Sequence, residues 1–135
     1  MKTFIAILVV LTCMGTASAQ STEEAGRLTK ISGELAIRAI AFTKEGNIDM
    51  AVSYMTAAVD VAKAAKDAEL IDHTEKLLVV YRAGSMLGTA TAVALRGDQL
   101  EAMELLKLAC KMAEQVSPGL EKTLEQVMGK ACSPI

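Results

Sequence analysis

The sequence predicts an all-α protein in which antiparallel helical hairpins form a small five-helix array or bundle. Its apolar residues recur every three or four positions, which is the period of amphipathic helices. No segment alternates apolar and polar residues as a half-buried strand does, and no Asn-Gly or Asp-Gly turn joins two β-rich runs. The 135 residues include eight methionines, few aromatic residues and no tryptophan, and small or flexible side chains of this kind favour closely packed helices.

The N-terminus has the three parts of a secretory signal peptide, which we predict at residues 1–19. A positive start precedes an apolar run at Phe4–Leu11, and the small residues Ala17–Ala19 match the site that signal peptidase accepts. The apolar run is far shorter than the roughly 20 residues of a membrane span. We therefore expect the mature chain to begin at Gln20, to lack an integral membrane span and to be secreted or periplasmic. A lipoprotein attached through Cys13 is the alternative, although the residue before it is larger than lipidation sites favour.

Local signals place the first two helices of the mature chain. Ser21 followed by Glu24 forms a capping box that opens the first helix, and Gly46 ends it because glycine tolerates a left-handed conformation. Asn47 is then suited to cap a second helix, which runs to about Lys66.

A single long third helix is expected at about residues 67–95. Gly84 and Gly88 lie inside it, and each costs up to about 1 kcal/mol relative to alanine, so they either kink the helix or admit a close neighbour. After this helix, Gly97 and Asp98 have the same roles as Gly46 and Asn47. Gly97 ends the third helix, and Asp98 caps a fourth.

The mature chain, residues 20–135, is expected to form one helical domain. Its two hairpins fall at about 28–66 and 79–115, and a C-terminal helix follows at about 118–130. Pro118 starts this last helix, with the preceding serine as its cap, because proline suits the first helical position.

Two segments of the chain match one another at equal offsets. The first carries Leu35, Ala39, Phe42, Gly46, Asn47, Ala51, Met55 and Ala58, and the second carries Met86, Ala90, Val93, Gly97, Asp98, Ala102, Leu106 and Ala109. This order of bulky, small and apolar positions around a glycine turn resembles the tetratricopeptide (TPR) repeat, in which small residues lie where two helices cross. The copies differ from that family in lying 51 residues apart rather than about 34, and in lacking its initial tryptophan and final proline.

The extra residues between the two copies are best placed in the long third helix. A separate added helix would reverse the second hairpin relative to the first, whereas a longer third helix keeps both hairpins in the same sense. A plain irregular helical bundle is the alternative to a repeat.

The resemblance implies a non-catalytic module that binds a protein or a peptide on a concave face lined by the first helix of each hairpin. On this chain, that face corresponds to side chains of the first and third helices that point away from the following helix. These candidate binding residues are Arg38, Lys44, Arg82 and Thr89. Two repeats make a shallow groove, so we also expect homodimerisation or docking on a larger partner.

Two other functions stay open from the sequence. The chain could carry an apolar small molecule or a lipid between its methionine-rich and alanine-rich helices, or it could be a structural or inhibitory protein of the immunity type with one tight partner. A nucleic-acid partner is not expected, because the formal net charge is −2 and no basic face is evident.

No enzyme activity, metal site or cofactor is expected. The single histidine, His73, lies close to Glu69 and Asp72, but no nucleophile has a fixed spacing from it, so we expect it on a helix surface. The sequence contains no H-E-x-x-H, C-x-x-C, G-x-S-x-G or P-loop motif.

Cys110 and Cys132 survive signal cleavage, and an even number of cysteines in an oxidising compartment favours a disulfide between them. The bond requires the chain to fold back after Gly129, because a straight helix would carry Cys132 roughly 12 Å past the position opposite Cys110. Such a bond would stabilise the fold by about 3 kcal/mol. Two buried, unreactive thiols are the alternative.

Overall fold

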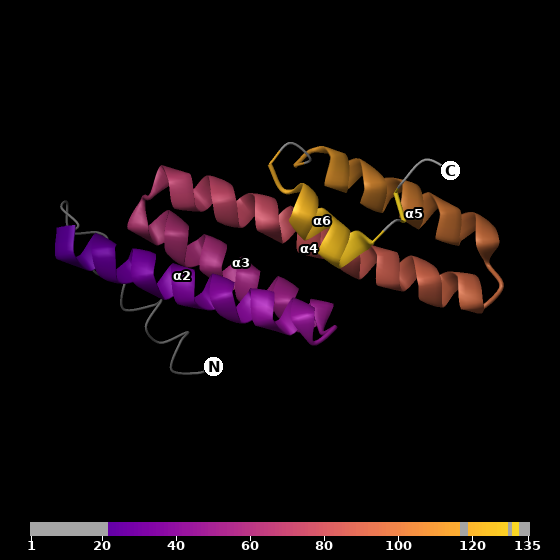
Figure 1. Ribbon diagram of the computed structural model, residues 1–135, viewed down its shortest axis with the longest axis horizontal. Coiled ribbons are helices and arrows are strands. Elements are labelled where there is room, and N and C mark those ends of the chain that lie inside the picture. The colour runs from indigo at the N-terminus through magenta and orange to yellow at the C-terminus, as the bar shows by residue number, and fades with distance from the viewer. Residues whose placement is uncertain (1–21, 117–118, 130, 133–135) are drawn as a thin grey trace.

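The computed structural model of the protein describes residues 22–116, 119–129 and 131–132. Within these ranges the chain forms five α-helices and no strand, which confirms the predicted all-α fold. The helices are α2 (Thr22–Lys44), α3 (Ile48–Ala65), α4 (Ala68–Leu95), α5 (Gln99–Glu114) and α6 (Glu121–Met128) (Figure 1). The predicted signal peptide at residues 1–19 and the predicted cap Ser21 lie outside the described residues.

The long helix α4 is the axis on which the other helices are arranged (Figure 1). Helix α3 packs along its N-terminal half and α2 packs on α3, whereas α5 packs along its C-terminal half. The short helix α6 lies against the middle of α4. The single long third helix predicted from the spacing is therefore confirmed, and the five packed helices are compatible with a helical repeat.

The two turns that contain glycine followed by Asn or Asp form as the sequence predicts. Asn47 caps α3 by accepting a hydrogen bond from the backbone N–H three residues later, at 3.3 Å, and Asp98 caps α5 in the same way at 3.2 Å. These bonds satisfy backbone donors that the first turn of a helix otherwise leaves without partners.

The break between α3 and α4 is shorter than the other two described turns. Lys66 ends α3 in a left-handed conformation with φ of 58°, and the Asp67 carboxylate caps α4 by accepting from the Leu70 N–H at 3.2 Å. Because only two residues join these helices, α3 and α4 are held side by side from the turn onward.

Gly84 lies where three helices meet. A β-carbon at this position would overlap the side chain of Val127 in α6 and contact that of Ile48 in α3. By contrast, a β-carbon at Gly88, one turn later, would meet no atom within 4 Å. Of the two roles considered for these glycines, Gly84 therefore admits a close neighbour.

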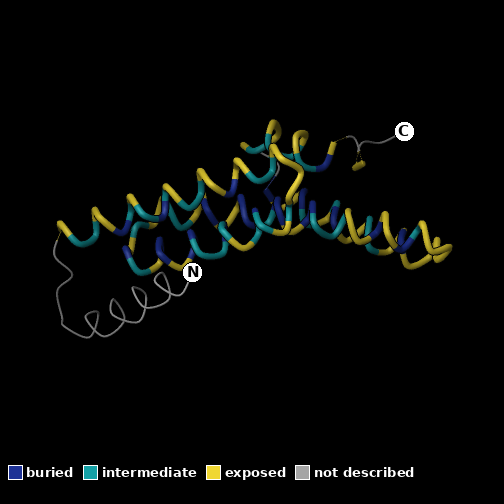
Figure 2. Tube along the Cα trace, turned by 90° about the horizontal axis from the view of Figure 1, so that it is seen from below, coloured by how far each residue is buried: buried dark blue, intermediate teal, exposed yellow. Residues whose placement is uncertain are grey.

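The main hydrophobic core lies between α2, α3 and the N-terminal half of α4, with one member, Val116, just after α5. Its buried members are Ala39, Ala51, Met55, Ala58, Val59, Leu77, Leu78, Val80, Tyr81 and Val116. One buried polar contact joins α2 to α3, where the Ser32 hydroxyl donates to the Ala58 carbonyl at 2.7 Å. Figure 2 shows buried residues where these helices run together and more exposed residues toward the far end of the α4–α5 hairpin.

The C-terminal helix is shorter than the predicted 118–130. It begins at Glu121, because Gly119 has a φ of 112° and cannot belong to a right-handed helix. The Gly119 N–H instead donates to the Glu121 carboxylate at 3.1 Å. The predicted start at Pro118 is therefore wrong, and Pro118 itself lies outside the described residues.

A disulfide joins Cys110 of α5 to Cys132, with 5.5 Å between the two α-carbons. Helix α6 ends at Met128 with Gly129 as its cap, and the disulfide places Cys132 beside α5. The favoured pairing of the two cysteines is therefore the one in the structure, and the bond fits an oxidising compartment.

Candidate functional site

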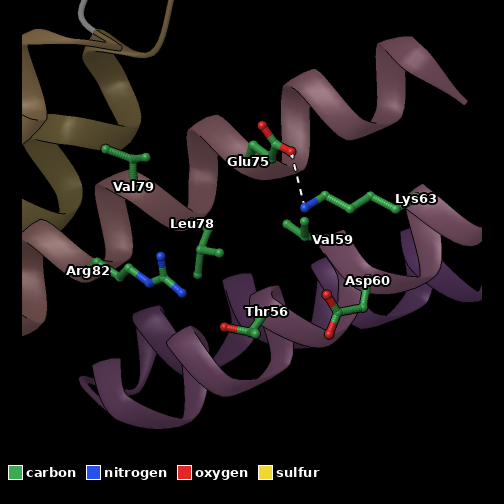
Figure 3. Close-up of a pocket in the computed structure, with 8 residues that line it drawn as sticks. All are labelled: Thr56, Val59, Asp60, Lys63, Glu75, Leu78, Val79 and Arg82. Atoms are coloured by element: carbon green, nitrogen blue, oxygen red, sulfur yellow. Dashed lines mark ion pairs between the residues drawn. The ribbon is translucent and has the colours of Figure 1, made fainter.

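A surface groove runs between α3 and α4, and we call it the α3–α4 groove. It has a volume of about 300 Å³. Its walls are Thr56, Val59, Asp60 and Lys63 of α3, with Glu75, Leu78, Val79 and Arg82 of α4 (Figure 3). Since the two helices are antiparallel and joined by a two-residue turn, residues near the end of α3 face residues near the start of α4.

The groove has an apolar floor and a charged rim. Val59 and Leu78 are buried beneath it, while its four charged side chains are exposed. At the end nearest the turn, Lys63 Nζ lies 3.7 Å from Glu75 Oε1, across the groove (Figure 3). An exposed ion pair of this kind contributes at most about 1 kcal/mol to the stability of the fold. Its main effect is to close one end of the groove.

The other two charges of the rim are unpaired. Neither Asp60 nor Arg82 has a hydrogen-bond or ion-pair partner among the described residues. Figure 3 shows the Arg82 guanidinium pointing into the groove, toward Thr56. The Thr56 hydroxyl donates to the Val52 carbonyl at 2.7 Å, which leaves its oxygen free to accept. The groove therefore offers a cation and an anion to a ligand.

Helix α2 packs on the side of α3 that faces away from the groove. Its Ser32 hydroxyl donates to the Ala58 carbonyl of α3 at 2.7 Å. Successive residues of an α-helix are rotated by about 100° about its axis, so residues two apart lie on nearly opposite faces. Ala58 therefore faces α2, while Thr56 and Asp60 face the groove. Among the described residues, α3 therefore has α2 on one side and the α3–α4 groove on the other.

The structure places the four predicted binding residues on different surfaces. Arg82 lines the α3–α4 groove. Arg38 and Lys44 are exposed on α2, and Thr89 is exposed on α4, where its hydroxyl donates to the Ser85 carbonyl at 3.2 Å. None of these three residues lines the α3–α4 groove with Arg82.

Sequence reasoning missed the α3 half of this groove. Thr56, Asp60 and Lys63 recur at helical spacing and make a polar stripe on a helix that is otherwise mostly apolar. This stripe was the signal that could have found them, since the buried face of α3 instead carries Ala51, Met55, Ala58 and Ala62.

A second surface feature lies at the far end of the α4–α5 hairpin. Leu95 is 84% exposed, Leu100 is 75% exposed and Met103 is 57% exposed. In this region α4 has α5 as its main neighbour, so the large apolar side chains at the tip are left in water.

The histidine and the acidic residues show no metal-binding arrangement. His73 is exposed on α4, as predicted. In the described ranges, no group of three or more His, Cys, Asp or Glu side chains is placed to hold a metal ion.

Helix α4 is the one described helix long and apolar enough to cross a membrane by length and composition alone. Core helices of other proteins meet the same criteria, and α4 packs against α3, α5 and α6 with Leu77, Val80 and Ala83 buried. The described part of the chain therefore has no set of several membrane-crossing helices.

No protein-family model matches the chain, and neither a curated protein nor a solved structure shows significant similarity to it. What can be said of its function therefore depends on its own residues and their geometry.

Proposed function

We propose that the protein is an exported, non-catalytic helical module that binds a protein or a peptide in the α3–α4 groove. The observation that carries this proposal is the unpaired Asp60 and Arg82 on the rim of a groove whose floor is apolar. The partly exposed Thr56 and Val79 supply contact area, and the charges at the rim supply orientation and specificity.

The TPR-like order of small and bulky residues supports the same class of function. That family binds extended peptides or helices on helical surfaces, and it needs no catalytic residue to do so. In this chain the binding surface would differ from the family's, because it is formed by α3 and α4 rather than by α2 and α4.

The groove suits a polypeptide better than a lipid or an apolar small molecule. A carrier of such a molecule needs an enclosed, mainly apolar cavity. Four charged side chains line the α3–α4 groove, and an apolar ligand would desolvate Asp60 and Arg82 without pairing them.

Site-specific photo-crosslinking in the protein's own compartment tests the proposal. A photo-reactive amino acid replaces Val79, on the groove wall, or Lys30, on the exposed surface of α2 as the control. We expect a polypeptide adduct from position 79 and none from position 30, with its mass measured by mass spectrometry. If position 79 yields no polypeptide adduct, or if the mature protein purifies with a small apolar ligand instead, the proposal is wrong.

A further inference from the structure

We infer that the α3–α4 groove binds a helix of the partner that carries an acidic and a basic side chain one helical turn apart. The acidic side chain pairs with Arg82 and the basic side chain with Asp60. This inference rests on the proposed function, since it specifies the chemistry of the segment that the groove takes.

The charges of the groove divide into a satisfied pair and an unsatisfied pair. Lys63 and Glu75 neutralise one another at 3.7 Å, whereas Asp60 and Arg82 have no partner among the described residues. A ligand can therefore pair with Asp60 and Arg82 without breaking an existing ion pair. A ligand with two like charges would meet one attraction and one repulsion, which disfavours it.

The spacing of these charges matches one turn of a helix. Thr56 and Asp60 are four residues apart on α3, so they lie about 6 Å apart along the groove. Because Arg82 points toward Thr56, its positive charge lies near the level of Thr56, about one turn from Asp60 (Figure 3). Side chains at positions i and i+4 of a bound helix have the same spacing and share one face.

The shape of the site also favours a helix. The groove lies between two antiparallel helices, and α2 already packs on the side of α3 that faces away from the groove. A third helix laid in the open side would pack in the same manner, with axes about 8–10 Å apart. The floor residues Val59 and Leu78 are almost fully covered already, so the charges decide which helix binds.

Three synthetic peptides test the charge pattern. Each is alanine-rich and about 16 residues long, because shorter helices are marginal in water. They carry Glu and Lys, Glu and Glu, or Lys and Lys at positions i and i+4, and their helicity is checked by circular dichroism. Each is titrated into the ¹⁵N-labelled mature protein while the amide chemical shifts are followed. We expect the Glu/Lys peptide to shift the amides of Thr56, Asp60 and Arg82 and to bind at least about fivefold more tightly than the others.

A charge reversal in the groove provides a second readout. Arg82→Glu leaves two anionic positions, so the preference should change to the Lys/Lys peptide. Arg38→Glu makes the same change of net charge on α2, outside the groove, and should leave the preference for Glu/Lys intact.

The inference is overturned if the three peptides bind with equal affinity. It is also overturned if millimolar peptide leaves the amide chemical shifts of the groove residues unchanged, or if the Arg82→Glu variant keeps the preference of the native protein. If a polypeptide still crosslinks at position 79 in that case, partner binding stands and only the charge pattern is wrong.

Discussion

Val127 of α6 occupies the space beside Gly84 of α4 that a β-carbon at this position would need. The glycine therefore does more than lower the helix propensity of α4, because its missing side chain is what lets the C-terminal helix approach. Ile48 at the start of α3 borders the same space, so this point joins three helices.

Replacing Gly84 with alanine should destabilise the protein, although alanine is the better helix former. The new β-carbon would overlap Val127, whose β-branched side chain has few alternative rotamers. Overpacking of this kind costs about 1–3 kcal/mol, against a gain of up to about 1 kcal/mol in helix propensity. Chemical denaturation should therefore show a lower free energy of unfolding for Gly84→Ala.

Gly88→Ala is the matched control, one turn further along the same helix. Nothing lies within 4 Å of a β-carbon there, so this change should stabilise by about 0.5–1 kcal/mol. The double variant Gly84→Ala/Val127→Ala should recover part of the loss, because the smaller side chain makes room. Equal effects of the two glycine substitutions would contradict the packing found between α4 and α6.

The features that sequence reasoning located well are those with local causes. Asn47 and Asp98 cap the helices that follow them because a carboxylate or amide oxygen reaches a backbone N–H only three residues away. The long helix α4 could also be predicted from the sequence. The 51-residue offset between the two matching segments fits one extended helix, whereas a separate added helix would reverse the second hairpin relative to the first.

The features that sequence reasoning missed depend on packing between helices. The conformation of Gly119 moves the start of α6 to Glu121, which proline statistics alone do not reveal. Of the four predicted binding residues only Arg82 lines the groove, because the expected repeat geometry directed attention to α2 and α4. Asp60 becomes relevant only once α3 and α4 lie side by side with α2 on the side of α3 that faces away from the groove.

The disulfide between Cys110 and Cys132 should contribute about 3 kcal/mol to the free energy of unfolding, because it closes a loop spanning 22 residues in the unfolded chain. Urea unfolding with and without reductant measures this contribution. The variant Cys110→Ser/Cys132→Ser should have the stability of the reduced protein and should not respond to reductant. A native protein whose unfolding midpoint is the same with and without reductant would argue against a formed bond.

The buried hydrogen bond from Ser32 to the Ala58 carbonyl should stabilise the contact between α2 and α3 by about 1 kcal/mol. Ser32→Ala removes it but also gains helix propensity, so its effect must be compared with a serine that makes no such bond. Ser53→Ala supplies this comparison, since Ser53 is exposed on α3. We expect Ser32→Ala to be less stable than Ser53→Ala by about 1 kcal/mol in chemical denaturation, and equal stabilities would mean that the bond contributes nothing.

Tyr81 should make the protein less stable at alkaline pH. Burial raises the pKa of its hydroxyl above the ordinary value of about 10, and the hydrogen bond with Thr43 offsets this only in part. Below pH 10 the hydroxyl is protonated in both the folded and the unfolded chain, so it adds no pH dependence. As the pH rises from 10 toward the raised pKa, the unfolded chain loses this proton while the folded chain keeps it, and stability falls.

Tyr81→Phe isolates the contribution of Tyr81 to this alkaline loss of stability. At neutral pH the Tyr81 hydroxyl is protonated in both the folded and the unfolded chain, so the difference in stability between the variant and the native protein there serves as the reference. Above pH 10 the stability of the variant should decline less steeply than that of the native protein, so this difference should change in favour of the variant. Tyr54→Phe removes a hydroxyl from another tyrosine while retaining Tyr81, and it is the control. Denaturation curves between pH 7 and pH 11 measure all three proteins, and a constant difference between native protein and Tyr81→Phe would show that Tyr81 keeps its ordinary pKa.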